Sequence, residues 1–129
     1  MITLKTLPQA TAQEVFDQVT NHLLTQNEQS KQIGGTMCLY RGRSEEDDSI
    51  VLKCAAGCLI GDDEYLPVFE GLSWKDVIKD NSATVPAEHS ELIGSLQRVH
   101  DTYLPHSWDI QLAVVAEQFK LNTNVLNNY

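Results

Sequence analysis

Basic residues and long apolar runs are both scarce in this sequence. Its 129 residues include 9 Lys and Arg against 18 Asp and Glu, which gives a formal net charge of −9. Because binding to a phosphate backbone requires a basic surface, we expect no direct nucleic-acid binding. No apolar run reaches the length of about 18 residues that spans a bilayer, so we expect no transmembrane helix and no membrane association.

Cysteine is also scarce, with 3 residues in the chain. The first residues, Met1–Pro8, contain one basic residue and no long apolar run, so we expect no signal peptide. A protein that is not exported keeps its cysteines as thiols, and an odd number of them fits free thiols. We therefore expect a cytoplasmic protein with reduced cysteines.

The rest of the composition is that of an ordinary globular domain. The chain is 42% hydrophobic and 21% charged, and its length is typical of one domain, here residues 1–129. A chain of this size buries about two thirds of its unfolded surface, so it needs neither a disulfide nor a metal to fold. We expect no bound cofactor, because the sequence contains no Walker loop, glycine-rich dinucleotide turn or His-Glu-x-x-His motif.

Amphipathic patterns predict four helices. The clearest follows Thr11-Ala-Gln-Glu14, a capping box in which each side chain bonds to the backbone amide of the other residue. Ser73 is the expected N-cap of a short second helix, Pro86 lies in the expected first turn of the third, and Ser107 is the expected N-cap of the fourth. The apolar stripes at helical spacing are Val15, Val19 and Leu23; Trp74, Val77 and Ile78; Leu92, Leu96, Val99 and Tyr103; and Trp108, Leu112, Val115 and Phe119.

Two apolar runs predict a small β-hairpin. Thr36–Tyr40 and Ser49–Lys53 have strand-like composition, and the polar segment Arg41–Asp48 connects them. A lone two-stranded ribbon is marginal in water, so its apolar face must pack on helices. The small residues Ala55-Ala-Gly57 follow the second strand and allow close backbone approach. We therefore predict an α+β fold, a mostly helical single domain with one small antiparallel β-hairpin.

Several short motifs follow one another along the chain. The most specific is Lys53-Cys-Ala-Ala-Gly-Cys-Leu-Ile60, which is preceded by Cys38-Leu-Tyr-Arg41 and followed by Asp63-Glu-Tyr65, Glu70-Gly71 and Leu96-Gln-x-x-His100-Asp101. Their arrangement resembles a family of small uncharacterised proteins from bacteria and from their phages and prophages, with a Lys-Cys-Ala-x-Gly-Cys-Leu-Ile segment. The resemblance implies a cytoplasmic protein that acts inside a bacterium, and it assigns no catalytic role to any residue.

The three cysteines form the one constellation with chemical potential. Cys38 lies in the first predicted strand, and Cys54 and Cys58 follow the second, so pairing of the strands would bring the thiols together. With a histidine, they would offer the sulfur and nitrogen ligands that structural zinc prefers. The histidines available for the fourth position are His22, His89, His100 and His106. The alternative is that the cysteines are core residues, since a buried free cysteine behaves as a small hydrophobe.

Cys54, His100 and Asp101 also suggest a thiol nucleophile, a base and a carboxylate that orients the base. Adjacent residues of a helix point about 100° apart, so we expect Asp101 to be poorly placed to orient His100. The alternative is a surface pair, or a histidine that bonds to a neighbouring element. On balance the sequence favours a protein that is not an enzyme.

The acidic residues are concentrated in one segment. Residues 45–80 contain ten acidic and three basic side chains, a net charge of −7. Such a segment is either a plain solvated face or a surface that attracts a basic partner. The residues that we assign to a protein interface are Asp62, Asp63, Glu64, Tyr65 and Phe69.

We therefore predict a small acidic cytoplasmic protein that acts by binding another protein, as a phage or prophage accessory factor does. The alternative function is a small metal-binding protein or a thiol-dependent enzyme centred on Cys38, Cys54 and Cys58. An unusual zinc content would favour the alternative, whereas capture of one basic protein would favour the binding function.

Overall fold

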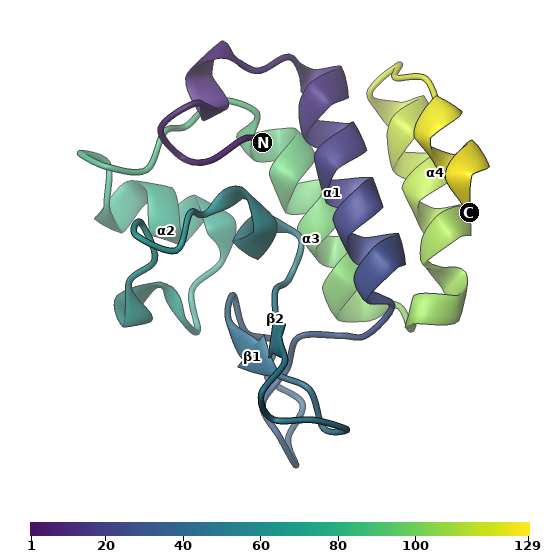
Figure 1. Cartoon of the computed structure of the whole chain (residues 1–129). Helices are drawn as coiled ribbons and strands as arrows, with labels where there is room; N and C mark the ends of the chain where they lie inside the picture. Colours follow the sequence, from purple (N-terminus) through teal and green to yellow (C-terminus); the bar gives the residue numbers. More distant parts are fainter.

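Three helices that pack against one another form the centre of the structure. The computed structural model describes residues 1–129, and its helices are α1 (Ala12–Gln26), α2 (Trp74–Asp80), α3 (Ser90–Thr102) and α4 (Trp108–Gln118). Helices α1, α3 and α4 contact one another, and the short α2 packs against α3 on the side away from α4 (Figure 1). None of these helices is both long enough and apolar enough to cross a membrane.

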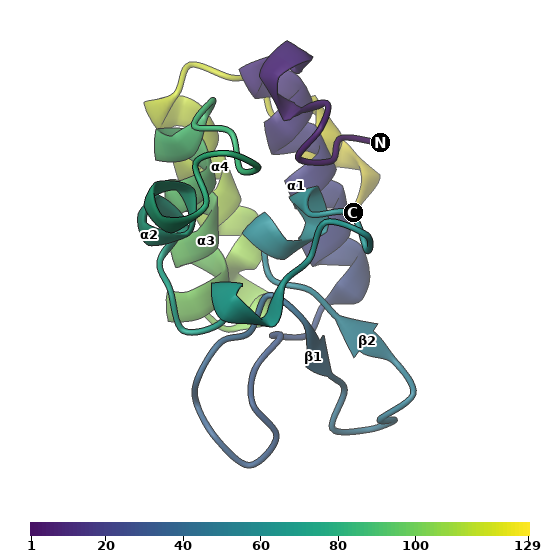
Figure 2. The ribbon, with the colours of Figure 1, turned by 90° about the vertical axis from the view of Figure 1, so that its left-hand side faces the viewer.

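A two-stranded antiparallel sheet lies at one end of the helices. Strand β1 (Gly42–Arg43) pairs with β2 (Val51–Leu52), with Gly42 opposite Leu52 and Arg43 opposite Val51. Figures 1 and 2 show that this hairpin projects below the helices. The predicted fold class, a mostly helical α+β domain with one small antiparallel hairpin, is confirmed.

The N-caps of α1 and α2 are the predicted ones. Thr11 Oγ1 accepts a hydrogen bond from the Glu14 amide at 3.1 Å, and the Thr11 amide donates to Glu14 Oε1 at 2.8 Å, so the capping box is complete. Ser73 Oγ accepts from the Asp76 amide at the start of α2. Helix α1 ends at Asn27, whose φ of 51° is the left-handed conformation that is common after a helix C-terminus.

The N-termini of α3 and α4 differ from the prediction. Pro86 precedes α3 and does not lie in its first turn, because the Val85 amide donates to the Asn81 carbonyl and holds the chain in a separate turn. His89, with φ of 62°, then directs the chain into the helix. Ser107 is the N-cap of α4, as predicted, but it also ends a 3-10 turn and its side chain makes no capping hydrogen bond.

The core lies where α1, α3 and α4 meet the segment that follows β2. A Cβ atom at Gly57 would lie 2.5 Å from the Tyr40 carbonyl oxygen, so glycine alone permits this approach of two backbones. The predicted role of the small residues after β2 is therefore confirmed. The largest fully buried apolar side chains include Phe16, Leu23, Leu59, Phe69, Leu96, Trp108 and Leu112.

The strand that pairs with β2 is not the predicted one. The sequence predicts Thr36–Tyr40, but β1 lies inside the predicted connection Arg41–Asp48. The Thr36–Tyr40 backbone turns back on the residues before it, and the Leu39 amide donates to the Ser30 carbonyl at 2.9 Å. Gly34, with φ of 73°, lies in the turn between these segments. The pattern of apolar and β-branched residues identifies a strand-like segment, but it does not identify the neighbour with which that segment pairs.

Two charged side chains hold the irregular segment between α1 and α2. The Glu70 carboxylate accepts from the amides of Tyr40 at 2.8 Å and Arg41 at 3.1 Å. The Arg41 guanidinium donates to the carbonyls of Gly57 at 2.8 Å and Ile60 at 2.6 Å. We call Glu70 and Arg41 the polar clamp, because together they connect backbone segments that no sheet or helix joins.

The polar clamp predicts a specific loss of stability. Glu70→Gln removes the charge that two backbone amides contact, so we expect the free energy of unfolding to fall by about 1–3 kcal/mol. The matched control is Glu117→Gln on the exposed side of α4, which should change it by less than about 0.5 kcal/mol. Urea unfolding of both variants measures the difference, and equal stabilities would contradict the role of the clamp.

Candidate functional site

A groove with a volume of about 700 Å³ runs along one face of α3. The opposite wall is formed by residues 36–38, Tyr40 and residues 71–75, and Cys54 also lines the groove. We call this feature the α3 groove. The lining residues of α3 recur at intervals of three and four, which places them on one face of the helix. They include Ser90, Glu91, Gly94, Gln97, Arg98 and Asp101.

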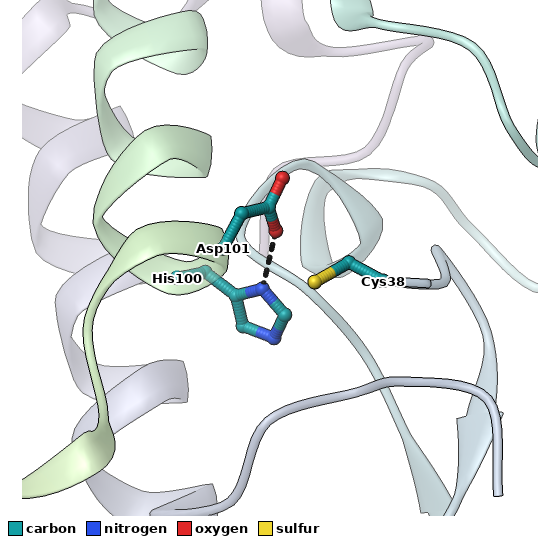
Figure 3. A group of neighbouring side chains, drawn as sticks. All are labelled: Cys38, His100 and Asp101. Carbon is teal, nitrogen blue, oxygen red and sulfur yellow. Dashed lines mark hydrogen bonds and ion pairs between the residues drawn. The ribbon is translucent and has the colours of Figure 1, made fainter. Parts of the chain in front are cut away.

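Cys38, His100 and Asp101 meet at the end of the α3 groove that is nearest to the C-terminus of α3 (Figure 3). Their sulfur, nitrogen and oxygen atoms all lie within 4.8 Å of one another. His100 Nδ1 lies 2.7 Å from Asp101 Oδ1. The imidazole is fully buried and stacks on the Trp108 ring, with 5.6 Å between the ring centroids.

The hydrogen bonds of His100 fix its tautomer. The Ser30 amide donates to Nε2 at 2.9 Å, so Nε2 is an acceptor and carries no proton. The ring proton therefore lies on Nδ1, and it is donated to Asp101 Oδ1. Both nitrogens of the ring are thus occupied by protein partners.

This tautomer does not fit a metal ion. A metal at Nδ1 requires the ring proton to lie on Nε2, where it would face the Ser30 N–H. A metal at Nε2 would displace the same amide. Either arrangement leaves a buried N–H without its acceptor, at a cost of about 1–3 kcal/mol. His100 is better explained as the residue that connects the segment after α1 to α3.

The structure does not bring the three cysteines together as one site. Cys38 lies beside His100, Cys54 is 1% exposed, and Cys58 Sγ donates to the Ala55 carbonyl at 3.1 Å. Cys38, Cys54 and Cys58 therefore do not provide the shared ligand set that the predicted hairpin suggested. The physical reason is the strand pairing, since the segment that contains Cys38 does not pair with β2.

The environment of the thiols keeps them protonated. Burial raises the pKa of Cys38 to about 12, and the Asp101 carboxylate beside it acts in the same direction. Burial also raises the pKa of Cys58 to about 12 and raises the pKa of Cys54. Because the thiolate is the nucleophilic form, none of the three is activated at neutral pH.

The prediction that Asp101 is poorly placed to orient His100 is wrong. Rotation about the side-chain bonds brings the carboxylate back to the imidazole, and Figure 3 shows it directly above the ring. The Gln97 amide also donates to Asp101 Oδ1, at 2.9 Å. The pair still does not activate Cys54, because the Nε2 lone pair that a general base needs is bonded to Ser30.

The acidic residues assigned to a protein interface lie in different environments. Asp62 and Asp63 are exposed, and Asp62 lies 3.5 Å from Arg41 and 3.6 Å from Lys53. The Glu64 carboxylate accepts from three backbone amides, two of them in the N-terminal segment. Glu64 is thus used inside the fold, whereas Asp62 and Asp63 are accessible to a partner.

The two aromatic residues of that assignment are less accessible. The Tyr65 hydroxyl donates to Glu70 Oε2 at 2.7 Å, and the ring is half-buried. Phe69 is 1% exposed, so it offers no surface to a partner in the folded chain. Its neighbours Leu66 and Val68 are 46% and 61% exposed, and these are the apolar side chains that this stretch presents to solvent.

Most residues of the α3 groove were not identified as site residues from the sequence, Trp74 and Gly94 among them. In the sequence, Trp74 belongs to the apolar stripe of the second helix, and Gly94 is not singled out. Both line the groove. Gly94 was the feature of the sequence that could have indicated the groove, because a glycine in a helix interior usually has a packing or functional reason.

Comparisons with known proteins leave the chain without an assigned relative. A scan against protein-family models found no matching family, and searches of curated proteins and of solved structures found no match. The resemblance based on the Lys53–Ile60 segment therefore stays a prediction.

We predict slow modification of the thiols in the folded chain. With pKa values near 12 for Cys38 and Cys58, the thiolate fraction at pH 8 is far below that of an unfolded cysteine, whose pKa is about 8.5. Alkylation followed by mass spectrometry should show Cys38 reacting first, because it lines the groove and is only partly buried, and Cys54 last, because it is 1% exposed. Rapid labelling of all three without denaturant would contradict this.

We also predict that zinc does not stabilise the fold. A ligand that binds only the folded state raises the melting temperature, but both nitrogens of His100 are already bonded. Thermal unfolding with equimolar Zn²⁺ and with a chelator should therefore give the same midpoint. A zinc-dependent rise that disappears in Cys38→Ser would show that the Cys38–His100–Asp101 cluster is a metal site after all.

Proposed function

We propose that this protein acts by binding another protein, and that its acidic surface attracts a basic partner. The observation that carries the proposal is the set of acidic side chains that are exposed and unpaired. Among the acidic residues of 45–80, Asp62 alone lies within ion-pair distance of a basic group. The exposed residues without such a partner are Glu45, Glu46, Asp47, Asp48, Asp63, Asp76 and Asp80.

The strongest local concentration of charge is the loop between β1 and β2. Four consecutive acids, Glu45–Asp48, are all exposed there, and the hairpin projects away from the helices (Figure 2). None of these four carboxylates forms an ion pair with a basic side chain of the protein. They increase the rate at which an oppositely charged partner is encountered and oriented.

The proposal includes the class of partner and the compartment. The same negative charge disfavours phosphate backbones, so the partner is a protein and not a nucleic acid. The resemblance of the Lys53–Ile60 segment supports an accessory role in the cytoplasm of a bacterium, including one that carries a phage or prophage. No membrane and no cofactor is required for this role.

A thiol-dependent enzyme or a metal protein is the less favoured function. The pKa values of the three thiols are raised by burial, which is opposite to the lowered value of an activated cysteine. The His100 nitrogen that would act as a base or ligand is bonded to a backbone amide. Both observations support a structural role for the cluster.

A pair of charge variants tests the proposal. The loop variant combines Glu45→Gln, Glu46→Gln and Asp48→Asn, and it retains Asp47, whose carboxylate bonds to Ser49. We expect slower association with a basic protein retained from a bacterial extract, and weaker binding as salt rises, because charges are screened beyond about 10 Å at 0.1 M salt. Surface plasmon resonance measures both effects.

The control variant changes the net charge equally at other places. It combines Glu88→Gln, Asp109→Asn and Glu117→Gln, all exposed and outside residues 45–80. This variant should associate nearly as fast as the native chain. If the two variants behave alike, or if affinity ignores salt, the acidic segment has no special role. Ser44 is left unchanged, because it is buried and its hydroxyl donates to the Glu28 carboxylate at 2.9 Å.

A further inference from the structure

One position on the α3 wall of the groove has no side chain, and packing does not explain it. Gly94 lies in the interior of α3, where glycine is less favourable than alanine. A Cβ atom built on Gly94 would meet no atom within 4 Å apart from its chain neighbours and the backbone of its own helix. The fold itself therefore gives no reason for glycine at this position. Its effect is to leave the α3 backbone open to an occupant of the groove.

The opposite wall contains an unused hydrogen-bond donor. Trp74 lines the groove and is 3% exposed, and its indole N–H has no acceptor. The indole N–H of Trp108, in contrast, donates to the Tyr103 carbonyl at 2.9 Å. A buried indole N–H normally has a partner, and leaving one without a partner destabilises the fold. The indole nitrogen is itself buried, so a carbonyl group in the groove reaches it once the indole turns toward the groove, and it then supplies the missing acceptor.

The length of the groove matches a stretch of extended chain. Its α3 wall includes residues from the first turn of the helix, at Ser90, to the last, at Thr102. A helix of 13 residues is about 20 Å long. An extended chain rises about 3.3 Å per residue, so the groove accommodates about six extended residues.

The polar groups along the groove suit a polypeptide backbone. Lys75 lies 3.7 Å from Glu91, whereas Arg98 has no ion-pair partner. Both nitrogen donors that bond to Asp101 use Oδ1, so no nitrogen donor reaches Oδ2. The groove thus offers donors at Arg98 and Trp74 and an acceptor at Asp101. A peptide presents carbonyls and amides at every residue and can satisfy both kinds.

We infer that the α3 groove binds an extended segment of a partner protein, of about six residues. A carbonyl of the segment accepts a hydrogen bond from the Trp74 indole, and the segment lies over the α3 backbone at Gly94, where no side chain blocks it. The inference rests on the proposed function in requiring a protein partner, but it concerns a different surface from the acidic loop.

Panning of a phage-displayed library of random hexapeptides on the folded chain tests the inference. Enriched peptides should bind Gly94→Gln about tenfold more weakly or worse, because the glutamine side chain enters the groove. Gly94→Gln should not lower the melting temperature, since its Cβ atom meets no neighbour and glutamine has a higher helix propensity than glycine. The matched control, Val114→Gln on the exposed side of α4, should leave peptide binding unchanged.

The two indole groups give a second readout. In the isotope-labelled chain, an enriched synthetic peptide should shift the Trp74 indole N–H resonance and leave that of Trp108 in place. If no peptide is enriched, or if the peptides bind Gly94→Gln as tightly as the native chain, the inference is overturned.

The outcome also separates this inference from the proposed function. Peptides that shift the amides of residues 45–48 and not Trp74 would overturn the groove and support the acidic surface. Peptides that shift Trp74 and bind the loop variant normally would support the groove, whatever the fate of the acidic-surface proposal.

Discussion

One constraint shapes this fold: a long segment with little regular structure must find hydrogen-bond partners for its backbone N–H and C=O groups. Between the end of α1 and the start of α2 the chain forms two short strands and a few 3-10 turns. Buried N–H and C=O groups there must still find partners. Side chains supply them: Glu70 and Arg41 hold the centre of the segment, and His100 accepts the Ser30 amide at its beginning. The helices provide the core, but these bonds decide how the rest of the chain lies on it.

The same constraint explains why a cluster that resembles a catalytic site is better understood as a structural one. A thiol, an imidazole and a carboxylate lie within 4.8 Å of one another here, and these are the groups from which catalytic triads and metal sites are built. The direction of the hydrogen bonds decides otherwise, because an imidazole nitrogen that accepts from a backbone amide is available neither to a proton nor to a metal. The partners of both ring nitrogens are therefore more informative than the distance between the side chains.

The two proposed surfaces have complementary physical roles. Charge on the projecting loop acts over a distance of about the Debye length, so it affects how fast a partner arrives. In our proposal the α3 groove acts only in contact, through hydrogen bonds and shape, so it would affect how long the partner stays and which segment is accepted. A protein of this size can thus separate attraction from recognition, since the residues of the loop and of the groove lie on different elements.

The sequence by itself determined the helical part of this protein, because helix formation is local. The capping box at Thr11, the cap at Ser73 and the apolar stripes all lie within a few residues of the structure that they specify. Tertiary structure alone decided the partner of β2, the tautomer of His100 and the opening at Gly94. The first two depend on a contact between residues that are distant in the sequence, and the third depends on the absence of such a contact. Periodicity carries no information about such contacts, since many distant partners are compatible with the same local pattern.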